Sequence, residues 1–128
     1  MQDFRNLRVW QKAHELTLEV YKCTQRFPRE ELYGLTSQMR RAAASSPANL
    51  AEGCCRQGDT EFSRFAQIAL GSISELEYFL VLSRDLSFVN NDDYERLDSL
   101  LNETKRMLIA LIQKLRSQEH VGNKNSGL

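Results

Sequence analysis

Residues that break or cross-link a backbone are scarce in this chain, whose 128 residues include only two prolines, six glycines and three cysteines. An odd cysteine count, with Cys54 and Cys55 adjacent, does not suit the disulfide framework of a small secreted domain. It suits reduced thiols, so we expect a cytoplasmic protein. The composition, 41% hydrophobic and 27% charged, is that of an ordinary soluble globular chain.

Long apolar runs and a net charge are missing as well. No run approaches the roughly 18 to 20 apolar residues of a membrane span, and the N-terminus lacks the apolar core of a secretory signal, so no membrane partner is expected. The net charge is zero, which indicates no bulk attraction to nucleic acid. The zero hides an asymmetry, because residues 1–58 carry nine basic against six acidic side chains and residues 59–128 carry eight against eleven. Such halves can steer a polyanion, or they can let neighbouring helices or subunits pair.

Catalytic motifs are also lacking. Di-iron bundle enzymes use Glu-x-x-His pairs, and neither His14 nor His120 follows a glutamate at that spacing. Glycine-rich phosphate loops and Gly-x-Ser-x-Gly are absent from the sequence. We therefore predict no enzymatic activity, no metal and no cofactor. The alternative is a metal-binding or ligand-binding enzyme within a helical bundle, with carboxylates such as Glu52, Glu75 and Glu77 as the ligands.

What the chain does contain is apolar residues spaced alternately by three and four. One such seam consists of Val9, Ala13, Leu16, Val20, Cys23 and Phe27, another of Phe62, Ala66, Ala69, Ile73, Leu76 and Leu80, and a third of Tyr94, Leu97, Leu101, Thr104, Leu108, Leu111 and Leu115. This spacing is typical of helices that pack along one another. Leu7, Trp10, His14, Leu18 and Tyr21 form a second stripe beside the first seam, which indicates an additional contact such as a subunit interface.

The seams and connectors predict four helices, over about residues 7–27, 36–57, 60–86 and 92–116. Helices of this length with short connectors favour an all-α fold, an up-down-up-down antiparallel four-helix bundle. We expect one bundle domain over residues 1–117. Residues 118–128 have no apolar period and are predicted to form a flexible C-terminal tail.

Pro47 lies in the middle of the second predicted helix, where it removes a backbone donor. Two interpretations are open. Ser46 can cap a new helix that has Pro47 at its first position. Alternatively, one bent helix runs through Pro47, the carbonyl of Ala43 loses its partner, and serine hydroxyls take up the freed group.

Four arginines bracket this segment and define a candidate nucleic-acid-binding strip: Arg40, Arg41, Arg56 and Arg64. Guanidinium groups suit phosphates, and equally the carboxylates of a neighbouring subunit. A Ser-Ser-Pro turn between two helices also resembles a helix-turn-helix DNA-binding regulator. The residues after the turn, "ANLAEGCC", are mostly small and apolar, which is unlike a recognition helix.

Three stretches together resemble a known family: "FRNLRVWQKAHELTLEVYK", "YGLTSQMRRAAASSPANLAEG" and "FSRFAQIALGSISELEYFL". In order and spacing they are similar to the bacterial four-helix-bundle proteins encoded in intervening sequences of large-subunit ribosomal RNA genes. The resemblance covers residues 4–116. It extends to the accessory protein of diversity-generating retroelements, which binds a reverse transcriptase and nucleic acid.

The resemblance implies homopentameric rings, and a partner that is nucleic acid or a nucleic-acid-associated protein such as a reverse transcriptase. It also implies that helix two is continuous but bent at Pro47, that Asn49 and Glu52 form a buried polar pair near the bend, and that Gly53 and Gly71 permit close helix contact. No catalytic residue is implied. The expected function is that of a non-enzymatic, homo-oligomeric interaction module.

Overall fold

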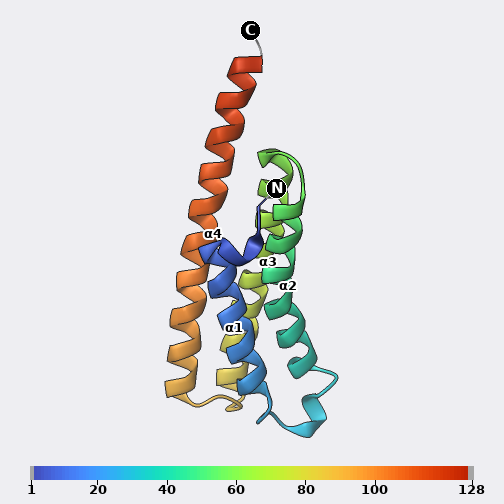
Figure 1. Cartoon of the computed structure of the whole chain (residues 1–128). Coiled ribbons are helices and arrows are strands. Elements are labelled where there is room, and N and C mark those ends of the chain that lie inside the picture. Colours follow the sequence, from blue (N-terminus) through green and yellow to red (C-terminus); the bar gives the residue numbers. More distant parts are fainter. Residues whose placement is uncertain (1, 127–128) are drawn as a thin grey trace.

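The computed structural model describes the backbone of residues 2–126 and the side chains of residues 2–118. The helices are α1 (Arg8–Thr24), α2 (Leu35–Cys55), α3 (Asp59–Asp85) and α4 (Asn91–Ser126), with short 3-10 turns η1 (Phe4–Asn6) and η2 (Arg29–Glu31). Figure 1 shows them as upright rods that alternate in direction. No strand occurs in the part of the chain that the structure describes. The predicted all-α four-helix bundle is confirmed.

Each helix contacts two of the others. Helix α2 packs against α1 and α3, and helix α4 packs against the same two helices. Within the described residues α1 and α3 do not contact each other, so they lie on opposite corners of the bundle. Their outward faces therefore point to opposite sides of the molecule.

The predicted seams form the core. All six positions of the first seam and all six of the α3 seam are buried, as are Leu97, Leu101, Thr104, Leu108 and Leu115 of α4. Leu111 is partly buried, and Ile112 beside it faces the core in its place. Burying about twenty such side chains supplies most of the folding free energy, because each contributes about 1.5–3 kcal/mol.

Helix α2 continues without a break through Pro47. The alternative in which Ser46 starts a new helix is therefore wrong. Because Pro47 has no N–H, the carbonyl of Ala43 needs other donors. The Ser46 hydroxyl donates to it at 3.0 Å, and the Thr17 hydroxyl of α1 lies 3.0 Å from the same oxygen. Serine takes up the freed carbonyl as predicted, and α1 adds a second hydroxyl.

The last helix is longer than the sequence predicts. The fourth helix was expected to fade near Arg116, but α4 continues to Ser126 and extends beyond the other three helices (Figure 1). At its start, the side chain of Asn90 accepts the backbone N–H of Asp93 at 2.7 Å and caps the helix.

Candidate interaction surface

The outward face of α3 is apolar. Between Arg64 and Arg84 the helix carries only two charged residues, Glu75 and Glu77. Glu77 is bonded to Lys105 of α4 at 2.7 Å, which leaves Glu75 as the single charge on the exposed side of this stretch. Helices that are apolar all round are normally covered on every side. One face of α3 packs on α2 and α4, and none of the described residues covers the opposite face.

We define the α3 surface as Ile68, Gly71, Glu75 and Tyr78 of α3 together with Ile109 of α4. Tyr78 is 60% exposed, Ile68 42% and Ile109 40%. Gly71 and Ile109 also line a groove of about 480 Å³ between α3 and α4, with Leu70 and Ile112 among its apolar lining and Gln67, Ser74, Gln113 and Arg116 as its polar groups.

By length and composition α3 is apolar enough to cross a membrane, with a mean hydropathy of 1.3. The sequence holds no unbroken run of 18 apolar residues, as expected, because glutamine, serine and glutamate interrupt α3, yet an 18-residue window of the helix still reaches this mean hydropathy. A core helix of a bundle meets the same criterion, and the buried positions of α3 form part of the common core. The composition by itself is weak evidence for a membrane partner.

A second exposed apolar area lies on the opposite corner. We define the α1 surface as Leu18 and Tyr21 of α1, Leu32 and Tyr33 of the connector, and Arg41 of α2. Leu18 is 50% exposed and Tyr33 93% exposed. A hollow of about 430 Å³ is lined by Tyr21, the two connector residues, Thr36, Ser37, Arg40 and Arg41. No carboxylate pairs with Arg41 among the described residues.

The predicted second stripe of α1 is divided between two environments. Its lower part, Leu18 and Tyr21, is exposed and belongs to the α1 surface. In its upper part, the indole of Trp10 stacks on His14 at 4.9 Å and is met by Phe4 of η1 at 4.8 Å. Phe4 therefore covers part of Trp10, whereas His14 remains exposed.

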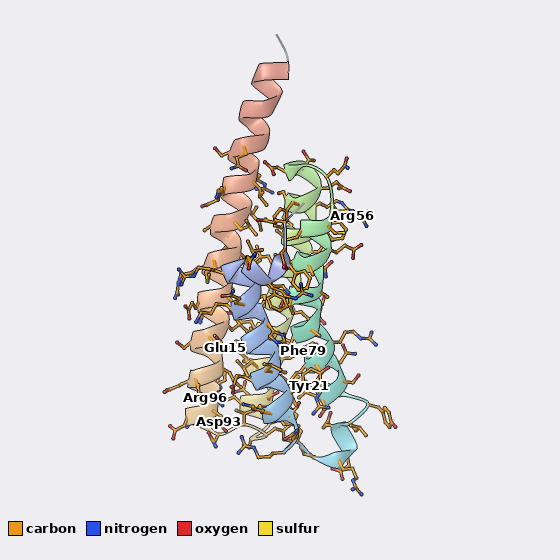
Figure 2. The ribbon with its side chains drawn as sticks, in the orientation of Figure 1. Glu15, Tyr21, Arg56, Phe79, Asp93 and Arg96 are labelled. Atoms are coloured by element: carbon orange, nitrogen blue, oxygen red, sulfur yellow. The ribbon has the colours of Figure 1, made fainter. Side chains whose placement is uncertain are left out.

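The structure does not form the predicted arginine strip. Arg40 and Arg41 lie about 23 Å along α2 from Arg56, at 1.5 Å per residue. Figure 2 shows Tyr21, on which Arg40 lies at 4.7 Å, in the lower part of the bundle and Arg56 near the upper end. The four arginines thus form two separate pairs.

The upper pair is engaged within the chain. Arg56 donates to Glu52 at 2.7 Å and Arg64 to Glu61 at 2.9 Å, and both guanidinium groups lie over the ring of Phe65. The hydrogen bond from Arg64 holds the pKa of Glu61 below its ordinary value. Each arginine already has a carboxylate partner, which lowers its availability for phosphate.

The predicted buried pair of Asn49 and Glu52 is wrong. Glu52 is exposed and bonds Arg56 one turn further along the helix. The amide of Asn49 donates to the carbonyl and hydroxyl oxygens of Ser45, and Ser72 of α3 donates to the same hydroxyl at 2.8 Å. Asn49 therefore supports a hydroxyl contact between α2 and α3. Glu52 and Arg56 are four residues apart, and side chains at this spacing meet on the surface of a helix, so the sequence itself contained a signal for this ion pair.

The two glycines expected at close contacts also differ. A Cβ on Gly53 would lie 2.9 Å from the ring of Phe62 and 3.0 Å from Cβ of Phe65, so the prediction is confirmed there. A Cβ on Gly71 would meet nothing within 4 Å. Gly71 belongs to the uncovered α3 surface and makes no close contact within the chain.

The three cysteines are free thiols. Burial raises the pKa of the Cys23 and Cys54 thiols, so both are neutral near pH 7 and poor nucleophiles. Within the described residues no three His, Cys, Asp or Glu side chains group in a way that could hold a metal ion.

The sequence analysis did not identify most of the exposed apolar residues described above. Ile68 and Tyr78 lie beside the seam of α3, and their apolar side chains at these positions were the available signal in the sequence. Leu32 and Tyr33 lie in a connector, where periodicity gives no signal.

The chain was compared with curated proteins, with solved structures and with protein families. None of the curated proteins matches the chain. A crystal structure of a protein of unknown function from the S23 ribosomal protein family of Bacteroides thetaiotaomicron VPI-5482 matches with a TM-score of 0.73 and 25% sequence identity, over 81% of this chain and 97% of that one. Residues 5–110 match the 23S rRNA-intervening sequence protein family. With most of its length matched, the chain belongs to the 23S rRNA-intervening sequence protein family.

Proposed function

We propose that the protein is a non-enzymatic interaction module that assembles from identical copies into a closed ring. The observation that carries the proposal is the presence of two different exposed apolar surfaces on opposite corners of one bundle. The α3 surface lies on one corner and the α1 surface on the other, since α1 and α3 are diagonal. Exposed apolar areas of this kind mark sites of association.

Two unlike surfaces favour head-to-tail contacts. In a two-fold dimer the same patch meets itself, whereas a ring joins one patch of each copy to a different patch of the next. Charge supports this pairing, because the α1 surface carries the cation Arg41 and the α3 surface carries the anion Glu75. A ring of five is the size that the resemblance to the family implies.

A ring also presents its remaining surface in several copies, which suits a partner with repeated contacts. Following the resemblance to the retroelement accessory protein, that partner is nucleic acid or a nucleic-acid-associated protein such as a reverse transcriptase. Arg41 is exposed and has no carboxylate partner within the described residues, so nucleic acid and Glu75 of a neighbouring copy are alternative partners for it.

The head-to-tail arrangement is tested by breaking one surface at a time. Leu18→Asp removes the α1 surface and Tyr78→Asp removes the α3 surface, and light scattering after gel filtration gives the mass of each variant. We expect the unaltered protein to be a ring, and each variant to be a monomer with an unchanged helical circular dichroism spectrum. Leu86→Asp is the control, because Leu86 is similarly exposed (48%) and belongs to neither surface.

Mixing the two variants makes the test specific. Each has one intact surface, so together they can form one contact and stop at a one-to-one dimer. An unaltered protein that is monomeric at micromolar concentration, or a mixture that stays monomeric, contradicts the proposal.

A further inference from the structure

A polar pocket of about 260 Å³ lies at the lower end of the bundle, between the end of α1, the connector with η2 and the first turns of α2. Its polar lining consists of Thr24, Gln25, Arg29, Thr36 and Arg40. Two arginines face this one space, and no carboxylate lines it. The volume is below the roughly 300–1,000 Å³ of sites that enclose a whole small molecule, which suits a single charged group.

Thr36 is the unusual member of the pocket. Seven threonines and serines are buried in the described part of the chain, and six of them have a hydrogen bond: Thr17, Thr24, Ser46, Ser63, Ser83 and Thr104. Thr36 is 4% exposed, and its hydroxyl has no hydrogen-bond partner among the described residues. Buried hydroxyls normally have partners.

Thr36 lines both this pocket and the neighbouring hollow of the α1 surface. Among the described residues no fully enclosed side-chain oxygen or nitrogen lacks a partner, so the Thr36 oxygen is not sealed in the core. Thr36 lines the pocket, and a ligand there can supply the missing hydrogen bond.

Arg40 is held in place with donors to spare. Its Nε donates to the hydroxyl of Thr24 at 2.8 Å and one Nη donates to the carbonyl of Tyr21 at 3.3 Å, while the guanidinium lies over the Tyr21 ring. These bonds use two of its five N–H groups, so three are left. A guanidinium fixed before a ligand arrives loses little entropy on binding it.

Nearby carboxylates do not neutralise the site. The closest in the chain are Glu30 and Glu31, and the Glu31 carboxylate accepts the backbone N–H of Leu35 at 3.0 Å. Neither Arg29 nor Arg40 forms an ion pair within the described residues. The positive charge of the pocket therefore comes from two arginine side chains and not from the end of α2.

We propose that this pocket binds a phosphate group, with Arg29 and Arg40 as the cations and the Thr36 hydroxyl as an additional donor. Guanidinium groups bind phosphate oxygens through paired N–H donors. The phosphate can belong to a small phosphorylated molecule or to a nucleic acid. The proposal does not require ring assembly, and the pocket shares Leu32, Thr36 and Arg40 with the hollow of the α1 surface, so phosphate binding and assembly use the same corner of the bundle.

Inorganic phosphate is the probe, titrated calorimetrically at constant ionic strength into the full chain. We expect Arg40→Gln to weaken binding about tenfold or more, because it removes a charge-assisted contact, and Thr36→Val to weaken it by about three- to tenfold at nearly unchanged volume. Arg26→Gln is the matched control, since Arg26 lies at the same end of the bundle, pairs with Asp93 and does not line the pocket. It should stay within about twofold of the unaltered protein.

Two results overturn the proposal. One is the absence of phosphate binding to the unaltered protein, and the other is an equal loss in Arg26→Gln and Arg40→Gln, which would indicate only bulk charge. Light scattering on the same samples separates loss of binding from loss of assembly. Thr36→Val keeps the test valid if Arg40→Gln disturbs the fold.

Competition identifies the source of the phosphate. An RNA octamer with a 5′-phosphate and the same octamer with a 5′-hydroxyl are each added to the phosphate titration. Competition by the first alone supports a terminal phosphate, and competition by both supports internal phosphodiesters. Competition by neither, with inorganic phosphate still bound, supports a small phosphorylated molecule.

Discussion

The contacts of α2 with its neighbouring helices differ in composition from the contact between α1 and α4. We call each contact between two helices a helix–helix seam. Where α2 meets its neighbours, small residues and hydroxyls fill the contact: Gly53 lies against Phe62 and Phe65, and Ser45 accepts a hydrogen bond from Ser72. Where α1 meets α4, long charged side chains bridge the helices: Lys12 to Glu103 at 3.4 Å, Arg26 to Asp93 at 2.8 Å, and Arg96 to Glu19. Figure 2 shows Asp93 and Arg96 at the lower end of α4.

The contacts of α2 depend on close fit between side chains, whereas the contact between α1 and α4 also depends on ion pairs. A contact between small residues has no adjustable side chain, so any added atom must displace backbone or aromatic rings. An exposed ion pair can lose one partner to water at small cost. The α2 seams should therefore be intolerant of change, and the α1–α4 seam tolerant.

The largest effect is expected at Gly53. Gly53→Val should lower the free energy of unfolding by about 2–3 kcal/mol, because its side chain collides with Phe62 and Phe65. Gly71→Ala is the control, since nothing lies within 4 Å of the added Cβ. Loss of glycine in a helix should raise the free energy of unfolding of the monomer there by about 0.5–1 kcal/mol. Urea denaturation measures both, and an equal sign for the two substitutions would contradict the comparison.

A smaller effect is expected at Thr17, whose hydroxyl lies 3.0 Å from the carbonyl of Ala43. The single hydroxyl proton of Thr17 is shared between the carbonyls of Ala13 at 2.8 Å and Ala43 at 3.0 Å. Thr17→Val therefore removes a donor from both and should cost about 1–2 kcal/mol of unfolding free energy. Thr17→Ser keeps the hydroxyl and serves as the control. In a Pro47→Ala background the restored backbone N–H can bond Ala43, so the cost of Thr17→Val should shrink. An equal cost in both backgrounds would show that the contribution of Thr17 to stability does not depend on the backbone N–H that is missing at Pro47.

The smallest effect is expected in the α1–α4 seam. Arg96 is bonded to Glu19, which raises the pKa of its guanidinium, yet the Arg96 side chain remains 51% exposed. Arg96→Ala should lower the free energy of unfolding by about 0.2–1 kcal/mol in dilute salt, and by less in 1 M sodium chloride. Thermal or urea unfolding at both salt concentrations tests this. If Arg96→Ala lowered the free energy of unfolding more than Thr17→Val does, ion pairs would contribute more to the stability of the bundle than the buried hydroxyl contact, which contradicts the comparison.

The helices and their buried faces could be predicted from the sequence, because apolar residues spaced alternately by three and four lie on one face of a helix. Val9 to Phe27 and Phe62 to Leu80 are buried at every predicted position, since residues three and four apart share one helix face. The role of Ser46 followed from the missing N–H of Pro47 by the same local reasoning. Local rules were sufficient wherever the interacting groups lie within one or two turns.

The site could not be predicted in the same way because it depends on where helices end and which corners they occupy. The four arginines looked like one strip in the sequence, but about four helical turns separate Arg41 from Arg56. The phosphate pocket joins Thr24, Arg29 and Thr36 from three successive elements, and only the path of the connector brings them together. The hydroxyl of Thr36 was indistinguishable from any other until the partners of the remaining hydroxyls were known.

The diagonal placement of α1 and α3 has a consequence for the order in which the bundle can close. Three of the four seams join helices that follow one another in the chain, whereas the α1–α4 seam spans the segment from Thr24 to Asn91. Closing a loop of about 65 residues carries the largest entropic cost of the four contacts. Opposite charges attract over longer distances than apolar side chains do. The contact between α1 and α4, which has the largest entropic cost, is therefore also the one in which the two helices attract each other before they touch.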